Sequence, residues 1–545
     1  MTKPFAGGKP FAITLDQGSS RVNHTGSWRT RRPEYIDRLP PCSDACPSGE
    51  DIQGWLARAE EGDYRAAWEL LVRDNPLPAI MGRACYHPCE AACNRARLDE
   101  AVSVHSVERF PGDLAIAEKW SFGVPAESTG KRVLVIGAGP SGLSAAYHLA
   151  RLGHVVTVRE ALPCPGGMMR YGIPKYRLPR EVLDAEIDRI LGLGVRLELS
   201  APITDVVESS REYDACFAAI GAHLANRVEI PASDASRIVD ALKLLQDVEA
   251  GAAPHIGRRV AVYGGGDTAL DAARTAQRLG AEETCIVYRR GRSSMPADAL
   301  EVAEALEEGI QVRWLRTIHS FDSGRLLLER VETDAHGALH ATGALESIEA
   351  DTLVLAVGQN VDLSILEKVD GVRVTDRVVE VDSCMMTGHR GLFAGGDMVP
   401  AKRTIATAVG HGKQAARSID AYLRGSAVIA PPRRDIATFE TLNAWYYSDA
   451  DRTVQPTLHA ARRRSTFEEV HQGLTADSAL FEARRCMSCG NCFECDNCYG
   501  VCPDNAVVKL GPANGFRIDL DFCKGCGLCA AECPCGAIRM VAEDV

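Results

Sequence analysis

The chain has 545 residues, which is enough for three or four domains of about 150 residues each. Its net charge of −12 argues against nucleic acid or an anionic membrane surface as a partner. The first residues, MTKPFAGGKPFAITLDQGSS, lack the apolar core and cleavage pattern of a signal peptide, and no apolar run approaches the roughly 20 residues that span a bilayer. We therefore expect a cytoplasmic protein with no membrane span and no nucleic-acid partner.

Cysteine is the residue type that most needs explaining. Fifteen of the 20 cysteines lie in two dense zones, 42–93 and 486–533. Disulfides are rare in a reducing cytosol, so this clustering indicates metal or iron–sulfur ligation. The other five are scattered, and we expect most of them to be small buried apolar residues: Cys164, Cys216, Cys285, Cys384 and Cys535.

The N-terminal part divides into an arm and a helical domain. Residues 1–40 are polar and rich in Gly, Pro and Arg, which predicts an extended arm. From Ile52, in DIQGWLARAEEGDYRAAWELLV, apolar residues recur at about the helical period. Cysteine pairs flank this segment, so residues 41–125 are predicted to form an α-helical [4Fe–4S] domain.

A first dinucleotide-binding unit begins near residue 130. KRVLVIGAGPSGLSAAYHLARLGHVVTVREA is typical of strand, glycine turn, helix and strand. Gly137 makes the tight turn, Gly139 lets the backbone approach a pyrophosphate, and Gly142 lets the helix pack on the strand. Glu160 ends the next strand, where it can accept a hydrogen bond from a ribose hydroxyl. The alternative is a similar turn that binds no nucleotide.

Two further stretches indicate that this first nucleotide is FAD. GHRGLFAGGDMV places Gly396 and Asp397 after an apolar strand, a pattern that brings an acid to the flavin ribityl chain in flavoproteins with two dinucleotide sites. PGGMMRYGIPKYRLP contains Gly166 and Gly167, which let the backbone lie close to the flavin ring. We expect the FAD-binding domain to comprise 130–230 and 350–425.

A second unit, RRVAVYGGGDTALDAARTAQRLGAEETCIVYRR, predicts an NAD(P)H-binding domain over 231–349. Its predicted nucleotide contacts are Gly264, Gly266, Asp267, Thr268 and Ala269. The following strand ends in Arg289 and Arg290 rather than in an acid, and arginine suits a 2′-phosphate. NADPH is therefore favoured over NADH. The alternative is that both arginines are solvated surface charges.

The C-terminal part is predicted to be a linker with a partly helical segment over 426–483, followed by a 2[4Fe–4S] ferredoxin-like domain over 484–545. The ferredoxin spacing C-x2-C-x2-C-x3-C-P fits one register and is followed by a second run. Since the fourth cysteine of each run ligates the other cluster, the expected ligand sets are Cys492, Cys495, Cys498 and Cys533 for one cluster and Cys502, Cys523, Cys526 and Cys529 for the other. Zinc binding is the alternative. Cys486 and Cys489 remain as one extra C-x2-C pair.

The order of these stretches resembles one known family, the small subunit of NADPH-dependent glutamate synthase and its relatives. These relatives include the N-terminal half of dihydropyrimidine dehydrogenase and the large subunit of NADH-dependent ferredoxin:NADP oxidoreductase. The matching stretches span roughly 130–425, from VLVIGAGPSGLSAAYHLA to FAGGDMV, and CSDACP with CYHPCEAAC resembles the family's N-terminal iron–sulfur domain. The resemblance implies that FAD stands between NADPH and iron–sulfur clusters. It requires no acid–base side chain, so we expect no catalytic residue.

The resemblance also implies ligands for two N-terminal clusters. Relatives carry a stretch close to EARRCMSC before the other N-terminal cysteines, whereas here it stands at 482–489. Carried over by position, one cluster is held by Cys42, Cys93, Cys486 and Cys489, and the second by Cys46, Cys85, Cys89 and Glu108. The alternative is that Cys486 and Cys489 are unligated, or that they shift the ferredoxin register.

The expected fold class is α/β: two Rossmann-like dinucleotide-binding domains, preceded by an α-helical iron–sulfur domain and followed by a bacterial-type ferredoxin domain. The expected function is that of an NAD(P)H:acceptor oxidoreductase subunit. It moves electrons between NADPH, FAD and four [4Fe–4S] clusters, and to or from a partner such as a 2-oxoacid oxidoreductase or another ferredoxin-dependent enzyme. Alternatives are a glutamate synthase small subunit proper, a disulfide reductase, and a non-enzymatic electron-wire or redox-sensing module.

Overall fold

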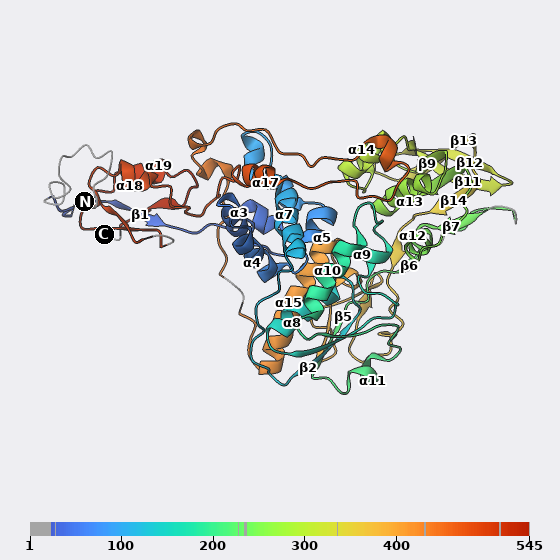
Figure 1. Ribbon diagram of the computed structural model, residues 1–545, viewed down its shortest axis with the longest axis horizontal. Helices are drawn as coiled ribbons and strands as arrows, with labels where there is room; N and C mark the ends of the chain where they lie inside the picture. The colour runs from blue at the N-terminus through green and yellow to red at the C-terminus, as the bar shows by residue number, and fades with distance from the viewer. Residues whose placement is uncertain are drawn as a thin grey trace.

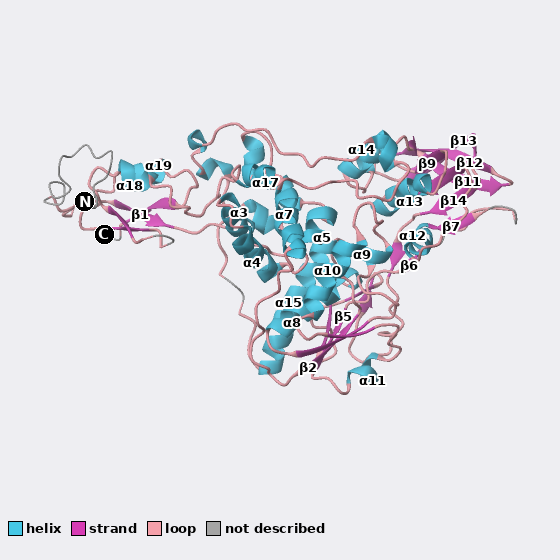
Figure 2. Ribbon diagram, viewed as in Figure 1, coloured by secondary structure: helices cyan, strands magenta, loops and turns pink. Residues whose placement is uncertain are grey.

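The computed structural model describes residues 23–27, 29–226, 228–233, 237–334, 336–429, 432–511 and 514–543. Two parallel sheets, a group of helices beside the first of them, and a small cysteine-rich module at one end make up most of the described chain (Figures 1 and 2).

The first sheet is built from chain segments that precede and follow the second sheet in the sequence. Its five strands are parallel, as expected for apolar strands that alternate with helices. In spatial order they are β18 (Leu392–Ala394), β5 (Ala215–Ala218), β2 (Arg132–Ile136), β3 (Val155–Arg159) and β4 (Arg196–Glu198). The principal helices packed with this sheet are α8 (Pro140–Arg151), α10 (Arg180–Leu191) and α15 (Ile405–Arg424). Their buried apolar side chains form one continuous core with the strands.

The second sheet is also parallel and has five strands. In order they are β10 (Gln311–Trp314), β9 (Glu283–Tyr288), β8 (Arg259–Tyr263), β14 (Thr352–Leu355) and β7 (Ile238–Asp240). Helices α12 (Ala241–Glu249), α13 (Asp267–Arg278) and α14 (Ala299–Glu307) pack with it. Because β14 lies in this sheet, the chain returns to the first sheet after residue 355 rather than at 350.

An antiparallel three-stranded sheet packs against the second sheet. It consists of β11 (Arg316–Asp322), β12 (Arg325–Thr333) and β13 (Leu339–Glu349). Phe321, Leu326 and Leu328 are buried against strand residues such as Val287 and Leu353. Shorter elements complete the two sheet domains: β6 (Leu224–Ala225), β15 (Gln359–Asn360), β16 (Val374–Thr375), β17 (Val378–Val379), α9 (Met168–Tyr171), α11 (Val206–Ser210), η2 (Arg292–Ser294) and η3 (Gly396–Met398).

The N-terminal helical group lies between the first sheet and the cysteine-rich module (Figure 1). It contains α2 (Pro41–Ala45), α3 (Ile52–Glu60), α4 (Tyr64–Asp74), α5 (Pro78–Ala84), α6 (Pro88–Ala91), η1 (Asn94–Arg97) and α7 (Val104–Ala117). Asp51 and Asp63 cap α3 and α4 through hydrogen bonds from Gly54 N and Ala66 N. The apolar faces of α3 and α4 bury Ile52, Leu56, Ala59 and Leu71, as the sequence periodicity predicts.

The cysteine-rich module includes a strand from the other end of the sequence. Within it lie α18 (Asn497–Val501), β19 (Val507–Lys509), β20 (Phe516–Ile518), α19 (Leu528–Ala531) and β21 (Ile538–Ala542). Strand β1 (Arg31–Tyr35) pairs antiparallel with β21, with Arg31 opposite Ala542 and Tyr35 opposite Ile538. In Figure 1 the blue β1 accordingly lies beside the red module. Part of the segment predicted to be an extended arm is thus a paired strand.

Residues 437–475, called the strap below, run along the helical group and reach the second sheet domain (Figure 1). The strap contains η4 (Phe439–Thr441), η5 (Ala444–Tyr446) and α16 (Ala460–Arg463), and α17 (Ala476–Ala483) follows it. At its far end Arg463 pairs with Glu307 at 2.8 Å, and Val470 N donates to Tyr176 O at 2.9 Å. The strap therefore connects the helical group to the second sheet domain.

Candidate functional site: a dinucleotide cavity and four thiol groups

A cavity of about 1080 Å³ lies between the two parallel-sheet domains. Of the predicted nucleotide-binding residues, those that line it are Gly137, Gly139, Glu160, Gly167, Gly264, Gly266, Asp267, Thr268, Arg289, Arg290, Gly396 and Asp397. Gly142, Gly166 and Ala269 are not among the lining residues. This volume is at the upper end of the range for ligand-binding cavities. The cavity lies at the carboxyl ends of two parallel sheets, a position that suits two dinucleotides.

The first glycine loop has the geometry that its spacing predicts. Gly137 has φ +101°, and a Cβ there would lie 2.5 Å from Ala219 O. A Cβ on Gly142 would lie 1.9 Å from Gly137 O, so only glycine lets α8 begin this close to the loop. Gly139 faces the cavity, and a Cβ on it would be 3.9 Å from its nearest neighbour, Gly167 Cα. The loop therefore leaves backbone open toward a ligand, which fits a pyrophosphate at the start of α8.

Two carboxylates face this first half of the cavity. Glu160 is buried and accepts hydrogen bonds from Ala138 N at 2.7 Å and Leu162 N at 2.9 Å. These bonds fix the carboxylate at the end of β3, beside the loop. Asp397 lies in η3; burial raises its pKa and the charge of Arg403 lowers it. Arg403 also lines the cavity, and the sequence analysis did not single it out.

The second glycine loop faces the cavity from the second sheet. Gly264 has φ +155°, and a Cβ on it would lie 2.2 Å from Ala356 O. A Cβ on Gly266 would meet nothing within 4 Å, which leaves its backbone accessible at the start of α13. Arg289 and Arg290 are both exposed at the end of β9 and line the cavity. Their position fits a phosphate on the ribose of a nucleotide bound at this loop.

Arg177 and Tyr86 also line the cavity and were not singled out in the sequence. Arg177 comes from the quoted stretch GIPKYRLP and pairs with Asp271 at 2.8 Å and with Glu301 at 2.7 Å, so it joins the two sheet domains. Tyr86 comes from the helical group and lines the cavity immediately after Cys85. Its place next to a predicted iron–sulfur ligand was the only signal in the sequence.

Four cysteines from distant segments meet beside α2. Burial raises the pKa of Cys42, and the neighbouring thiols Cys486, Cys93 and Cys489 raise it further. Burial likewise raises the pKa of Cys489, to about 11. Cys42 and Cys93 belong to the helical group, whereas Cys486 and Cys489 follow α17. The structure thus brings together the four residues that the family resemblance assigned to one cluster.

The second N-terminal set lies nearer the cavity. Burial raises the pKa of Cys46 to about 12, and Glu50 and Glu108 add to this effect. Cys85 and Cys89 lie close enough to Cys46 and Glu108 for these groups to raise their pKa values as well. Burial also raises the pKa of Glu108, whose Oε1 accepts a hydrogen bond from Asn75 at 2.9 Å. The structure therefore places Glu108 beside the three thiols.

The eight ferredoxin-type cysteines form two groups in the cysteine-rich module. Burial raises the pKa of Cys498 to about 11, and Cys492, Cys495 and Cys533 contribute to the shift. We call these four residues group A. Burial raises the pKa of Cys529 to about 12, with contributions from Cys523, Cys502 and Cys526. We call these four group B. In both groups the fourth cysteine of one run joins the other run, as ferredoxin spacing predicts.

The thiol spacing fits clusters better than single zinc ions. Tetrahedral zinc with 2.3 Å bonds to sulfur requires sulfur atoms about 3.8 Å apart. Within the described ranges, the one set of three or more His, Cys, Asp or Glu donor atoms that all lie within 4.8 Å of one another is His87, Glu90 and His105. The cysteine groups are therefore more open than a zinc site, as a four-iron cubane requires.

The expectation for the scattered cysteines is largely wrong. Cys216 and Cys535 are buried, but Cys164 is exposed and Cys285 and Cys384 are half-buried. Cys164 lies in the loop before α9, where local turns rather than an apolar core surround it. Isolated cysteines carry no pattern that predicts burial.

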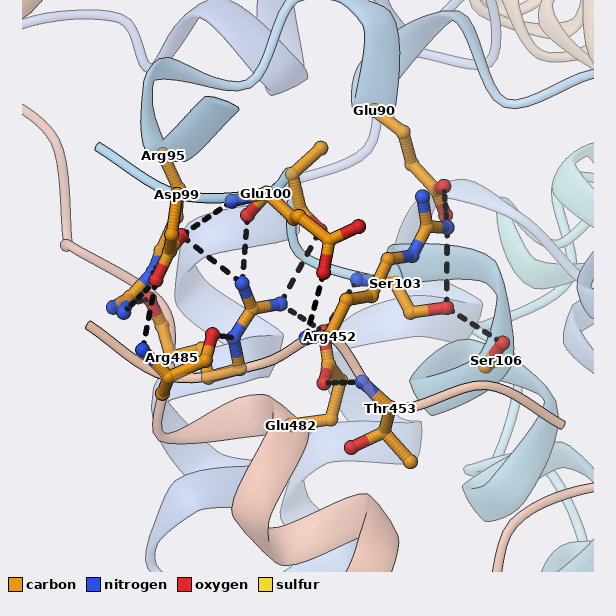
Figure 3. Close-up of polar contacts among 12 residues, drawn as sticks. Glu90, Arg95, Asp99, Glu100, Ser103, Ser106, Arg452, Thr453, Glu482 and Arg485 are labelled. Atoms are coloured by element: carbon orange, nitrogen blue, oxygen red, sulfur yellow. Dashed lines mark hydrogen bonds and ion pairs between the residues drawn. The ribbon is translucent and has the colours of Figure 1, made fainter. Parts of the chain in front are cut away.

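A buried ionic network, the Glu482 network, attaches the C-terminal segments to the helical group (Figure 3). Glu482 accepts hydrogen bonds from Ser103 N at 2.7 Å and Thr453 N at 2.8 Å. Arg485 donates to Glu482 at 2.7 Å and pairs with Asp99 at 3.1 Å. The network also includes Arg95, which pairs with Asp99 at 2.6 Å, and Arg452, which pairs with Glu90. It fixes α17, and so Cys486 and Cys489, beside Cys42 and Cys93.

Three family models match the chain. "Pyridine nucleotide-disulphide oxidoreductase" matches residues 131–415, "Dihydropyrimidine dehydrogenase domain II, 4Fe-4S cluster" matches 37–120, and "4Fe-4S binding domain" matches 516–539. These matches confirm the predicted fold class and the presence of FAD/NAD(P)-type and [4Fe–4S]-type domains. In the described part of the chain, no helix combines the length and apolar character needed to cross a membrane.

Curated relatives agree with these models. The NADP(+)-dependent formate dehydrogenase subunit beta of Moorella thermoacetica is 34% identical over 505 residues, which are 82% of this chain and 70% of that protein. The NADPH-Fe(3+) oxidoreductase subunit beta of Geobacter sulfurreducens is 32% identical over 514 residues, or 84% of this chain and 76% of that protein. The glutamate synthase [NADPH] small chain of Escherichia coli is 31% identical over 419 residues, or 70% of this chain and 89% of that protein. The chain therefore belongs to the pyridine nucleotide-disulphide oxidoreductase family, in the iron–sulfur group that includes the glutamate synthase small chains.

Proposed function

We propose that this chain is the NADPH-linked subunit of a larger redox enzyme and conducts electrons between NADPH, FAD, four [4Fe–4S] clusters and a partner protein. The single observation that carries the proposal is the order of the cysteine groups, which lead from the dinucleotide cavity to the far end of the molecule. Two relatives named as beta subunits, one of a formate dehydrogenase and one of an NADPH-Fe(3+) oxidoreductase, support the subunit role.

The first half of this route lies in the helical group. Tyr86 lines the cavity and directly follows Cys85, so the Cys46, Cys85, Cys89 and Glu108 site is the one that adjoins the dinucleotide cavity. Cys42 lies in α2 and Cys46 directly follows it, while Cys89 lies in α6 and Cys93 directly precedes η1. The two N-terminal sites are therefore neighbours.

The second half of the route crosses into the cysteine-rich module. Gly490 follows Cys489, and its N–H donates to Cys535 O at 2.6 Å. Cys535 lies two residues after Cys533 of group A. Cys498 of group A in turn raises the pKa of Cys529 of group B. Group A thus lies between the N-terminal sites and group B.

FAD, when bound, exchanges the paired electrons of a nicotinamide hydride for single electrons that iron–sulfur clusters carry. The residues of this chain hold the nucleotides and the clusters in sequence and supply no acid or base. The partner is a redox protein, and a 2-oxoacid oxidoreductase, a formate dehydrogenase or another ferredoxin-dependent enzyme fits the proposal. A glutamate synthase small subunit is disfavoured, because the Escherichia coli small chain matches only 70% of this chain.

Removing the group A cluster is expected to stop electron transfer between the group B cluster and the rest of the chain. We would replace Cys492 and Cys495 by serine, reduce the protein with dithionite, remove the excess and mix the protein rapidly with NADP⁺. In the wild-type protein, all clusters are expected to reoxidise; in the variant, the group B cluster should stay reduced while the N-terminal clusters reoxidise. Electron paramagnetic resonance of freeze-quenched samples measures this, and NADPH:dye activity should persist. If the group B cluster reoxidised in the variant as it does in the wild-type protein, the proposed order of the clusters would be wrong.

Replacing both Arg289 and Arg290 by alanine is expected to weaken the binding of NADPH but not that of NADH. A charge-assisted contact to the 2′-phosphate is worth about 1.5–3 kcal/mol, so KM for NADPH should rise roughly 10- to 150-fold. Steady-state dye reduction with each nucleotide measures the effect. Arg292→Ala is the matched control, because Arg292 follows both residues in η2 but does not line the cavity. An equal loss for both nucleotides would show that the two arginines do not read the 2′-phosphate.

A further inference from the structure

The cysteine-rich module contains two equivalent ligand turns. One reads Cys502-Pro503-Asp504-Asn505-Ala506, and the other reads Cys533-Pro534-Cys535-Gly536-Ala537. In each turn the alanine N–H donates to the ligand sulfur at 3.3 Å, from Ala506 to Cys502 and from Ala537 to Cys533. The alanine donor to the ligand sulfur is therefore the same in the two turns.

Cys535 provides a side-chain donor beside group A. Its Sγ is buried 3.7 Å from Sγ of Cys533. A cysteine that ligates iron is a thiolate and can only accept, so the S–H group of Cys535 is the donor. The equivalent position beside Cys502 of group B is Asp504, whose carboxylate is acceptor-only when ionised and has Lys524 Nζ at 3.7 Å.

Tyr35 provides a second donor to group A. Strand β1 places its ring beside Phe516, with 6.3 Å between ring centroids, and its Oη lies 3.2 Å from Sγ of Cys498. The phenol is protonated at neutral pH, so it donates to the ligating thiolate. Tyr35 and Cys498 are 463 residues apart in the sequence, and the pairing of β1 with β21 brings them together.

Hydrogen bonds to ligand sulfurs control the reduction potential of a cluster. Reduction adds negative charge that the sulfurs share, and a donor to sulfur stabilises the reduced form. We propose that Tyr35 and Cys535 are positioning residues that raise the reduction potential of the group A cluster. This inference rests on the proposed function, since it requires a cluster at group A.

The test is a redox titration of the full-length protein monitored by electron paramagnetic resonance. Cys495→Ser and Cys526→Ser, each at an exposed ligand, identify the signals of groups A and B. Tyr35→Phe and Cys535→Ala should each shift the group A midpoint to more negative values, and the double variant should shift it further. Cys535→Ser should keep it at or above the wild-type value, because the serine hydroxyl still donates.

The group B midpoint should stay constant in all of these variants. A group A midpoint that does not move in Tyr35→Phe and Cys535→Ala, or an equal shift of both groups, would overturn the inference while leaving the proposed function intact. Iron and sulfide analysis of the same samples separates the two ideas. A wild-type protein without both ferredoxin-type clusters would overturn the proposed function, and this inference with it.

Discussion

Serine at both Cys486 and Cys489 is expected to remove one complete cluster from the N-terminal helical group. On cubane stoichiometry, iron should fall from about sixteen to about twelve atoms per chain. The reason is that these two thiols complete the site whose other half is Cys42 and Cys93. Iron and acid-labile sulfide analysis measures the loss, and electron paramagnetic resonance should show both ferredoxin-type clusters unchanged.

The control for this double variant is Cys164→Ser with Cys384→Ser. These cysteines are exposed and half-buried, respectively, and belong to none of the four groups. The control should keep its full iron content. If the Cys486 and Cys489 variant also kept its full iron content, these two thiols would be unligated. The proposed site that they share with Cys42 and Cys93 (the shared site) would then be wrong.

Alanine at Arg485 is expected to release the C-terminal segment from the helical group. Arg485 is 2% exposed and Glu482 is fully buried, so removing the arginine leaves an uncompensated buried carboxylate. Breaking a buried pair in this way costs about 3–5 kcal/mol. Amide hydrogen exchange measures the local opening, and protection of the Ser103 and Thr453 amides that donate to Glu482 should fall by roughly two to four orders of magnitude.

Arg58→Ala is the matched control for Arg485→Ala. Arg58 also pairs with a glutamate, Glu61, at 2.9 Å, but the two side chains are 46% and 58% exposed. Such exposed pairs are worth about 0.2–1 kcal/mol. If Arg485→Ala lowered protection no more than the control does, the Glu482 network would not hold the segment in place.

Features with a local signal could be predicted from the sequence. The glycine turns follow from short-range sterics, which Gly137 and Gly264 illustrate through the carbonyl oxygens that a Cβ would meet. The thiol groups of the cysteine-rich module follow from ferredoxin spacing, and the meeting of Cys486 with Cys42 followed from family resemblance rather than from any periodicity.

Features that depend on distant contacts could not be predicted in the same way. Strand β1 has no partner nearby in sequence, and its arginine-rich composition predicted only an extended arm. The strap was predicted only as part of a partly helical segment after a linker, because its structure depends on separate tertiary contacts such as that between Arg463 and Glu307. Tyr35 and Cys535 belong to no recognisable motif. They matter because the fold places them beside the sulfur atoms of Cys498 and Cys533.

The pairing of β1 with β21 also has a consequence for biosynthesis. At 5–20 residues per second, a ribosome needs about 20–90 s after making Cys42 to reach Cys486. During that interval the helical group holds only part of the thiols of its shared site, and β1 has no partner strand. Co-translational folding can complete the two nucleotide domains but neither of these features. On the proposed ligand set, a cluster that uses all four thiols can therefore assemble only after Cys489 has been made, and Cys42 and Cys93 must stay reduced until then.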